Sequence, residues 1–345
     1  MRRRGRIDAL VAFFRPAHGG SAHLLLSRER FTAAQTLIAA SYAVLFFFAA
    51  GELFSWQGYL DAGELAPRWP VFWLRFVDTR AGIAAILWLH LAGGLLAVTL
   101  SRYRWARVLI FVSLLEQMAL KFSFGPVNHG DHLAVLVSFV LIFLPAGWHV
   151  RGSADRAVRA ATLLVFAGAQ AMILLTYSMA GMWKAGGILQ QWLRGEIVTY
   201  LHPQGLAHQV AAKMIEDDAP SVLGPWLVAH PWVGWLPGIA AIYLELFALW
   251  VVARPSLHRA WGLGLAFFHL ATHLTLGVGF PQNTLWLALF LVLSPFRPRL
   301  MDWRRAVGEL PVLGRWLIRW SSRRGGPPRT AKGPEKNPDE SVSSS

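Results

Sequence analysis

The 345-residue chain contains no cysteine and has few charged residues. Without cysteine the protein has no disulfides, no thiolate chemistry and no cysteine-ligated zinc or iron–sulfur centre, so any metal would depend on histidines and carboxylates. Only 15% of the residues are charged and 55% are hydrophobic, whereas soluble domains typically carry about 25% charged residues. The composition therefore indicates a protein that lies mostly in lipid.

The basic residues are distributed in a way that indicates membrane topology. A formal net charge of +14 would indicate nucleic-acid binding if the charges formed a continuous basic face. Here they fall in short clusters between apolar runs, so we expect no nucleic-acid partner. We expect membrane lipids as partners, because cationic side chains are attracted to anionic headgroups.

Eight apolar runs are long enough, or nearly so, to cross a hydrocarbon core of about 30 Å. They lie near residues 32–53, 81–100, 105–124, 132–147, 160–180, 234–252, 260–278 and 281–296. The fourth and eighth runs are the shortest, so counts of seven and nine stay open. The sequence predicts an all-α fold, a polytopic helical bundle of about eight transmembrane helices in the cell membrane.

Positive charge sets the orientation of such a bundle, because loops rich in Lys and Arg stay in the cytoplasm. When the connections are assigned to alternate sides, 26 of the 33 Lys and Arg residues share one side with both termini. Both termini are therefore predicted to be cytoplasmic. We expect a basic leader at 1–31, a transmembrane region at 32–299, and at 300–345 a tail that is amphipathic and then disordered.

The longest outer segment, residues 182–233, is expected to form short interfacial helices rather than a separate domain. Its apolar residues follow a helical period and are Trp192, Leu193, Ile197, Val198 and Leu201. Pro, Gly and acidic residues then interrupt the pattern.

Ionisable side chains inside spans are costly and commonly face a protein interior or an aqueous cavity. The predicted topology places most of them toward the outer ends of the spans, where helix packing could gather them in one cavity. They include Glu52, His90, Glu116, Lys121, His129, Asp131, His132, Lys184, Glu245, His269 and His273. Each histidine could equally hydrogen-bond a neighbouring helix without any catalytic role.

Two histidine patterns are candidate sites. Residues 128–132 read Asn-His-Gly-Asp-His directly before the fourth span, where imidazole and carboxylate could transfer a proton, bind a divalent cation or cap a helix. His269 and His273 are four residues apart and project from one helix face. No spacing matches a familiar metal-ligand signature, so we assign no metal.

Lys184 and Glu245 are the remaining candidates. Lys184 closes the fifth span, and small residues before it, Ala180 and Gly181, permit close helix approach. In a dry pocket Lys184 would be available as a base, whereas facing outward it would reach to headgroups. Glu245 lies among apolar residues and needs a partner, for which His269, His90 and Arg254 are candidates.

These motifs together resemble the HTTM family, which includes the membrane part of vitamin K-dependent γ-glutamyl carboxylase. Residues 177–184 read Tyr-Ser-Met-Ala-Gly-Met-Trp-Lys, and Trp192 and Gly195 follow. The resemblance continues in Asn128-His129, in Glu245-Leu246 with Arg254-Pro255, and in Phe268-His269, and covers roughly residues 30–300.

The resemblance implies a lipid-embedded pocket open to the extracytoplasmic side, with reduced naphthoquinone as the cofactor. By position, Lys184 would be the base that deprotonates the quinol, and His129 would orient or stabilise charged intermediates. Asn128, Asp131, His132, Tyr177, Glu245, His269 and His273 would be binding residues of the pocket. The family pairs its lysine with a second one, where this chain has Trp183, and its carboxylases continue into a β-rich peptide-binding region.

Two functions follow from the sequence. The first is a carboxylase- or oxygenase-like enzyme that acts on a quinol or another amphipathic small molecule. The alternative is a non-enzymatic membrane component, such as a peptide-toxin maturation or immunity partner or a transporter, whose function would follow segment 182–234. The sequence leaves the oligomeric state open.

Overall fold

The computed structural model describes residues 26–125, 129–196, 198–298, 300, 302–314 and 316–317. Within these ranges the chain is helical and contains no β-strand, which confirms the all-α prediction. It divides into two units, Met1–Leu300 and Met301–Ser345. In the second unit the structure describes the short helix α14 (Trp303–Gly308), which Asp302 caps by accepting from the backbone N–H of Arg305.

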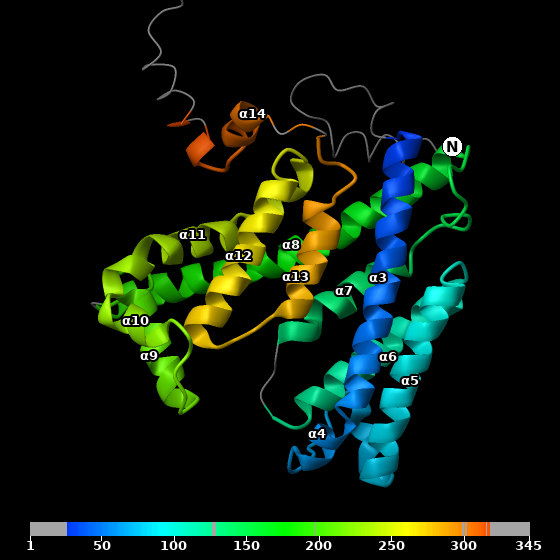
Figure 1. The fold of residues 1–345 in the computed structure, drawn as a ribbon, viewed down its shortest axis with the longest axis horizontal. Helices are drawn as coiled ribbons and strands as arrows, with labels where there is room; N and C mark the ends of the chain where they lie inside the picture. The colour runs from blue at the N-terminus through cyan, green and yellow to red at the C-terminus, as the bar shows by residue number, and fades with distance from the viewer. Residues whose placement is uncertain are drawn as a thin grey trace, which may run out of the picture. The chain divides into compact units, whose positions relative to one another are not determined.

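The first helices of the larger unit form one bundle. α3 (Arg28–Phe54), α5 (Thr79–Leu100) and α6 (Arg104–Phe122) run side by side, with α3 packed on α5 and α5 on α6 (Figure 1). The short helices α4 (Trp56–Asp61) and η1 (Val71–Phe76) lie between α3 and α5 in the chain. Buried Tyr59, Leu74 and Leu120 belong to an apolar cluster that joins these short helices to α5 and α6.

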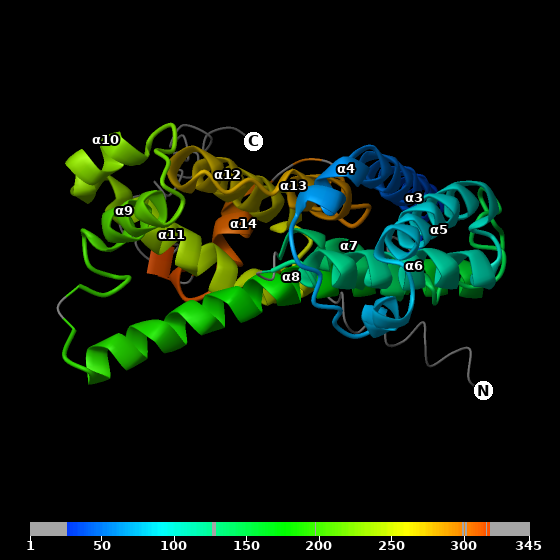
Figure 2. The ribbon, with the colours of Figure 1, turned by 90° about the horizontal axis from the view of Figure 1, so that it is seen from below.

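α8 (Arg156–Leu193) is the longest helix, with 38 residues, and forms a continuous rod in Figure 2. It begins where Asp155 accepts a hydrogen bond from the backbone N–H of Ala157. It packs against α3 and α7 (His132–Leu141), and also against α11 (Trp235–Leu246) and η4 (Ala248–Ala253). α8 therefore joins the first bundle to the helices that follow it in the chain.

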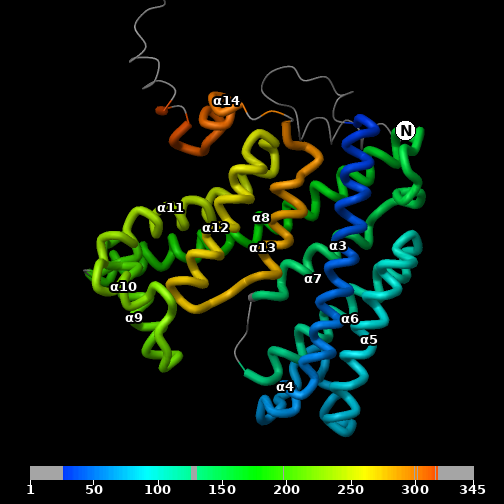
Figure 3. The backbone as a smooth tube through the Cα atoms, viewed as in Figure 1, coloured from blue at the N-terminus to red at the C-terminus, as the bar shows by residue number. Residues whose placement is uncertain are grey.

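The later helices form a second bundle. α12 (His258–Leu276) packs against α11, α13 (Pro281–Leu287) and the π-helical turn η5 (Ala288–Val292), as the chain path in Figure 3 shows. α12 ends at Gly277, whose φ of 74° is in the left-handed region that glycine adopts without strain.

Among the residues that the structure describes, three helices are long and apolar enough to cross a membrane: α3, α5 and α8. They coincide with the first, second and fifth predicted runs, and this supports the prediction of a membrane protein. The other runs also fall on helical segments, namely α6, α7, α11 with η4, α12, and α13 with η5.

The outer segment differs in part from the prediction. Its later portion does form short helices: α9 (Gly205–Glu216), α10 (Gly224–Ala229) and η3 (Pro231–Gly234). The helical period expected from Trp192 to Leu201 is wrong, because α8 itself continues through Leu193 and then stops. Ile197, which belonged to that period, lies outside the described residues. Gly195 has a φ of 71° and donates its N–H to the carbonyl of Trp192, which ends the helix.

Candidate functional site

An ion pair between Lys184 and Glu245 joins α8 to α11. The Lys184 Nζ lies 2.5 Å from the Glu245 Oε2. The Glu245 side chain is only 4% exposed and that of Lys184 is 31% exposed. The carboxylate is thus buried while the amine reaches the edge of the protein, and each neutralises the other's charge.

The partner of Glu245 is a correction to the sequence analysis. The candidates were His269, His90 and Arg254, and the structure selects Lys184 instead. His90 pairs with Ser113 on α6, with Nδ1 3.3 Å from the hydroxyl. Lys184 precedes Glu245 by 61 residues, so only the packing of α8 on α11 brings the two together.

Gly181 allows this close packing. A Cβ atom added at Gly181 would overlap the backbone nitrogen of Leu246 and lie 2.7 Å from the carbonyl carbon of Glu245. One turn earlier, the Ser178 hydroxyl accepts from the backbone N–H of Leu249 at 2.8 Å. The predicted role of Gly181 in close helix approach is therefore confirmed.

A second polar contact lies on the same face of α8. The Tyr177 hydroxyl is 2.5 Å from the Nε2 of His269 on α12, and both side chains are buried. The His269 ring lies near the rings of Phe268 and Phe280, with centroids 5.4 and 5.3 Å away. Among the described residues, its Nδ1 has no hydrogen-bond partner.

Phe268 links the two contacts, because the Lys184 Nζ lies 5.3 Å from the centroid of its ring. We call Tyr177, Lys184, Glu245, His269 and Phe268 the Lys184 cluster. Four predicted site residues, from three helices, therefore come together in one group. Aromatic walls, a lysine and a histidine with one uncommitted nitrogen could hold a flat molecule that carries oxygen atoms.

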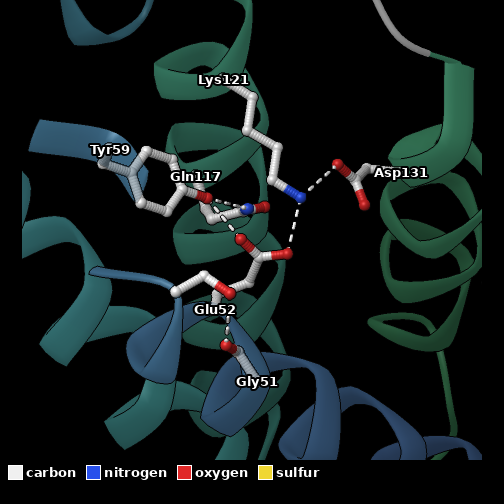
Figure 4. A network of polar contacts seen from close by, with 7 residues as sticks. Gly51, Glu52, Tyr59, Gln117, Lys121 and Asp131 are labelled. Atoms are coloured by element: carbon white, nitrogen blue, oxygen red, sulfur yellow. Dashed lines mark hydrogen bonds and ion pairs between the residues drawn. The ribbon is translucent and has the colours of Figure 1, made fainter. Parts of the chain in front are cut away.

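Asp131 belongs to a different group of contacts, shown in Figure 4. The Nζ of Lys121 lies 2.6 Å from Glu52 Oε1 and 3.0 Å from Asp131 Oδ2. The Tyr59 hydroxyl donates to the second oxygen of Glu52 and accepts from the side-chain amide of Gln117 at 3.2 Å. We call these five residues the Lys121 cluster.

The sequence analysis noted Glu52 and Lys121 but missed Tyr59 and Gln117. A charged residue at the end of each of two apolar helices was the signal that could have paired Glu52 with Lys121. In the part of the chain that the structure describes, no hydrogen bond or ion pair joins the Lys121 cluster to the Lys184 cluster.

The remaining predicted site residues are His132, His273, Asn128 and His129. His132 is half-buried, with its ring centroid 5.6 Å from that of Phe122. His273 is exposed although it lies one turn from buried His269. Asn128 lies outside the described residues, and so does the side chain of His129, whose backbone belongs to the turn η2 (His129–Asp131).

Comparison with known proteins found no match. No protein-family model, curated protein or solved structure matches the chain. Among the described residues, no group of three or more histidines and carboxylates is placed to hold a metal ion.

Proposed function

We propose that the protein is an HTTM-family integral membrane protein of about eight spans, with both termini in the cytoplasm. The distribution of Lys and Arg supports this orientation. The span count is supported by the helical segments at all eight predicted runs. We further propose that the Lys184 cluster is an enzyme site that takes a proton from a quinol, with reduced naphthoquinone as the cofactor.

The observation that carries the proposal is the ion pair between Lys184 and buried Glu245. Burial removes hydration from both charges. The free-energy difference between the ion pair and the neutral pair, an amine beside a carboxylic acid, is therefore smaller here than in water. A proton transferred from Lys184 to Glu245 leaves a free amine. That amine would be able to take a proton from a hydroxyl group of a bound quinol, and the ammonium group of Lys184 would then remain beside it.

The surroundings of the pair fit an aromatic cofactor. Phe268 and Phe280 offer ring surfaces for stacking. The Nδ1 of His269 is buried without a partner among the described residues, and a ligand oxygen would satisfy it. The role that the family resemblance gives His129, to orient or stabilise the reacting groups, stays a prediction, because its side chain lies outside the described residues.

The test is amine labelling of the lipid-reconstituted protein, read by mass spectrometry, with and without reduced naphthoquinone. Reduced naphthoquinone should protect Lys184. Lys213 is the matched control, because its side chain is 29% exposed against 31% for Lys184, and it also pairs with carboxylates. Equal labelling of Lys184 with and without the quinol would refute the proposal, and protection of Lys121 instead would place the quinol at the other cluster.

A second candidate function is a non-enzymatic membrane component, and exposed apolar residues on the outer segment favour it. Trp192, Ile215, Val222, Trp226 and Trp232 are all at least half exposed. Such residues would suit a membrane surface or a peptide partner. This function requires no reactive lysine, so a Lys184→Met variant that kept full cellular activity would favour it.

A further inference from the structure

An open pocket lies beside the Lys121 cluster, away from the proposed quinol site. Its volume is about 310 Å³, at the lower end of the range for small-ligand sites. Its lining is mostly apolar and consists of Glu52, Ser55, Gly58, Tyr59, Ala62, Lys121 and Phe124. The pocket is therefore large enough for a small amphipathic molecule or a lipid headgroup.

The charges beside the pocket do not cancel. Lys121 is a single cation shared by two carboxylates, Glu52 and Asp131, so the three groups carry one net negative charge. Arg68 is nearby, but its guanidinium reaches the carbonyl of Gly125 at 3.5 Å and does not line the pocket. A net negative charge at the wall of an open pocket favours the binding of a cation.

Glu52 has acceptor capacity left for that cation. One of its oxygens accepts from Lys121 and the other from Tyr59, and a carboxylate can accept about four hydrogen bonds. Burial and the neighbouring Glu52 raise the pKa of Tyr59, so its hydroxyl remains a neutral donor. Glu52 and Lys121 also lie in the last turns of α3 and α6, where the helix dipoles add partial negative charge.

Two aromatic rings complete the lining. The rings of Tyr59 and Phe124 lie 6.1 Å apart, and ring faces attract ammonium groups as well as hydrocarbon. We propose that this pocket binds the primary ammonium group of an amphipathic amine, with the cation at Glu52 and the apolar part against Tyr59 and Phe124. The amine could be a free molecule or the headgroup of an aminophospholipid, since both present the same ammonium group.

Gly58 offers a way to close the pocket without disturbing the fold. It lies in helix α4, lines the pocket, and a Cβ added there would meet no atom within 4 Å. A Gly58→Leu side chain should therefore project into open space and occupy the ligand's volume. Gly186 on α8 is equally open and is remote from the pocket, so Gly186→Leu is the matched control.

The experiment is equilibrium dialysis of labelled octylammonium against the full chain in phosphatidylcholine nanodiscs, with empty nanodiscs subtracted. We expect one saturable site, weakened about tenfold or more in Glu52→Gln, which corresponds to about 1.4 kcal/mol. Gly58→Leu should abolish this saturable binding, whereas Gly186→Leu and Lys184→Met should retain it. If added phosphatidylethanolamine competes with octylammonium, the natural ligand is the lipid headgroup. If it does not compete, the natural ligand is a free amine.

Three results would overturn the proposal. Octanol could bind as well as octylammonium, which would show partition without charge recognition. Glu52→Gln could bind like the parent protein. Gly58→Leu could keep full binding, which would place the amine outside the pocket even if Glu52→Gln lost it. Lys184→Met leaves this pocket intact, so a failure of the amine-binding proposal can be distinguished from a failure of the quinol proposal.

Discussion

The two bundles each hold a lysine paired with a buried or half-buried glutamate, but the charges balance in only one of them. Lys184 has one carboxylate partner, and Glu245 is almost completely buried. Lys121 has two, and their side chains, Glu52 and Asp131, are 16% and 11% exposed beside an open pocket. The comparison suggests that a neutral pair can be enclosed among apolar helices, whereas a net charge stays where water or a ligand can reach it.

The largest effect should come from removing the lysine of the balanced pair. Lys184→Ala leaves the buried carboxylate of Glu245 without a counterion, and we expect a loss of about 3 kcal/mol of stability with membrane insertion intact. Quinol-dependent activity should disappear. Thermal unfolding of the lipid-reconstituted protein measures the stability change.

The control is the double variant Lys184→Met with Glu245→Leu. It removes both charges and should recover most of the lost stability, because apolar side chains replace the pair. If the double variant were less stable than Lys184→Ala, the pair would be stabilising in its own right and the comparison would need revision.

A smaller effect should follow from separating the pair without removing it. Gly181→Ala inserts a methyl group into the backbone of α11 at Leu246, so α8 and α11 must move apart. We expect a loss of about 1–3 kcal/mol and weaker protection of Lys184 by reduced naphthoquinone. Gly186→Ala, with open space around the added atom, should cost nothing in the same thermal unfolding assay; equal losses in both variants would contradict the packing argument.

Asp131→Asn converts the unbalanced cluster into a balanced one. The amide side chain would keep an oxygen that accepts from Lys121, so stability should change by less than about 1 kcal/mol. Octylammonium binding should weaken, but less than in Glu52→Gln, because Asp131 does not line the pocket. Unchanged binding would show that the net charge of the three groups does not attract the ligand.

The smallest effect should come from Lys213, whose carboxylate partners, Glu216 and Asp217, are exposed. Lys213→Met breaks both ion pairs, yet water replaces the lost contacts. Thermal unfolding should show no measurable change. A loss of stability comparable to that of Lys184→Ala would mean that burial of the carboxylate partner does not explain the difference between the two lysines.

The sequence predicted the helical fold because apolar runs of membrane length carry a strong local signal. It also predicted close packing at Gly181, since small residues next to the end of a span favour helix contact. It did not predict that α8 continues to Leu193, because the period that links Trp192 to Leu201 runs across Gly195, where the helix stops.

The sequence indicated which polar side chains lie inside the protein better than it indicated which of them contact one another. Tyr177, Lys184, Glu245 and His269 come from α8, α11 and α12, and which side chains meet depends on how these helices pack. Asp131 was expected in the same cavity as Lys184, and instead it pairs with Lys121, only 10 residues earlier. The predicted topology assigns these side chains to one end of the spans, but it carries no information on which helices pack side by side.

The length of α8 makes membrane thickness a variable for this protein. From Arg156 to Lys184 the helix rises about 42 Å at 1.5 Å per residue, more than the hydrocarbon core of about 30 Å. With Arg156 at one surface, the depth of the Lys184 amine depends on helix tilt and on the lipid chain length around it. Longer acyl chains would immerse the amine and shorter chains would hydrate it, so the host lipids would set how much water reaches Lys184 without any change in the protein.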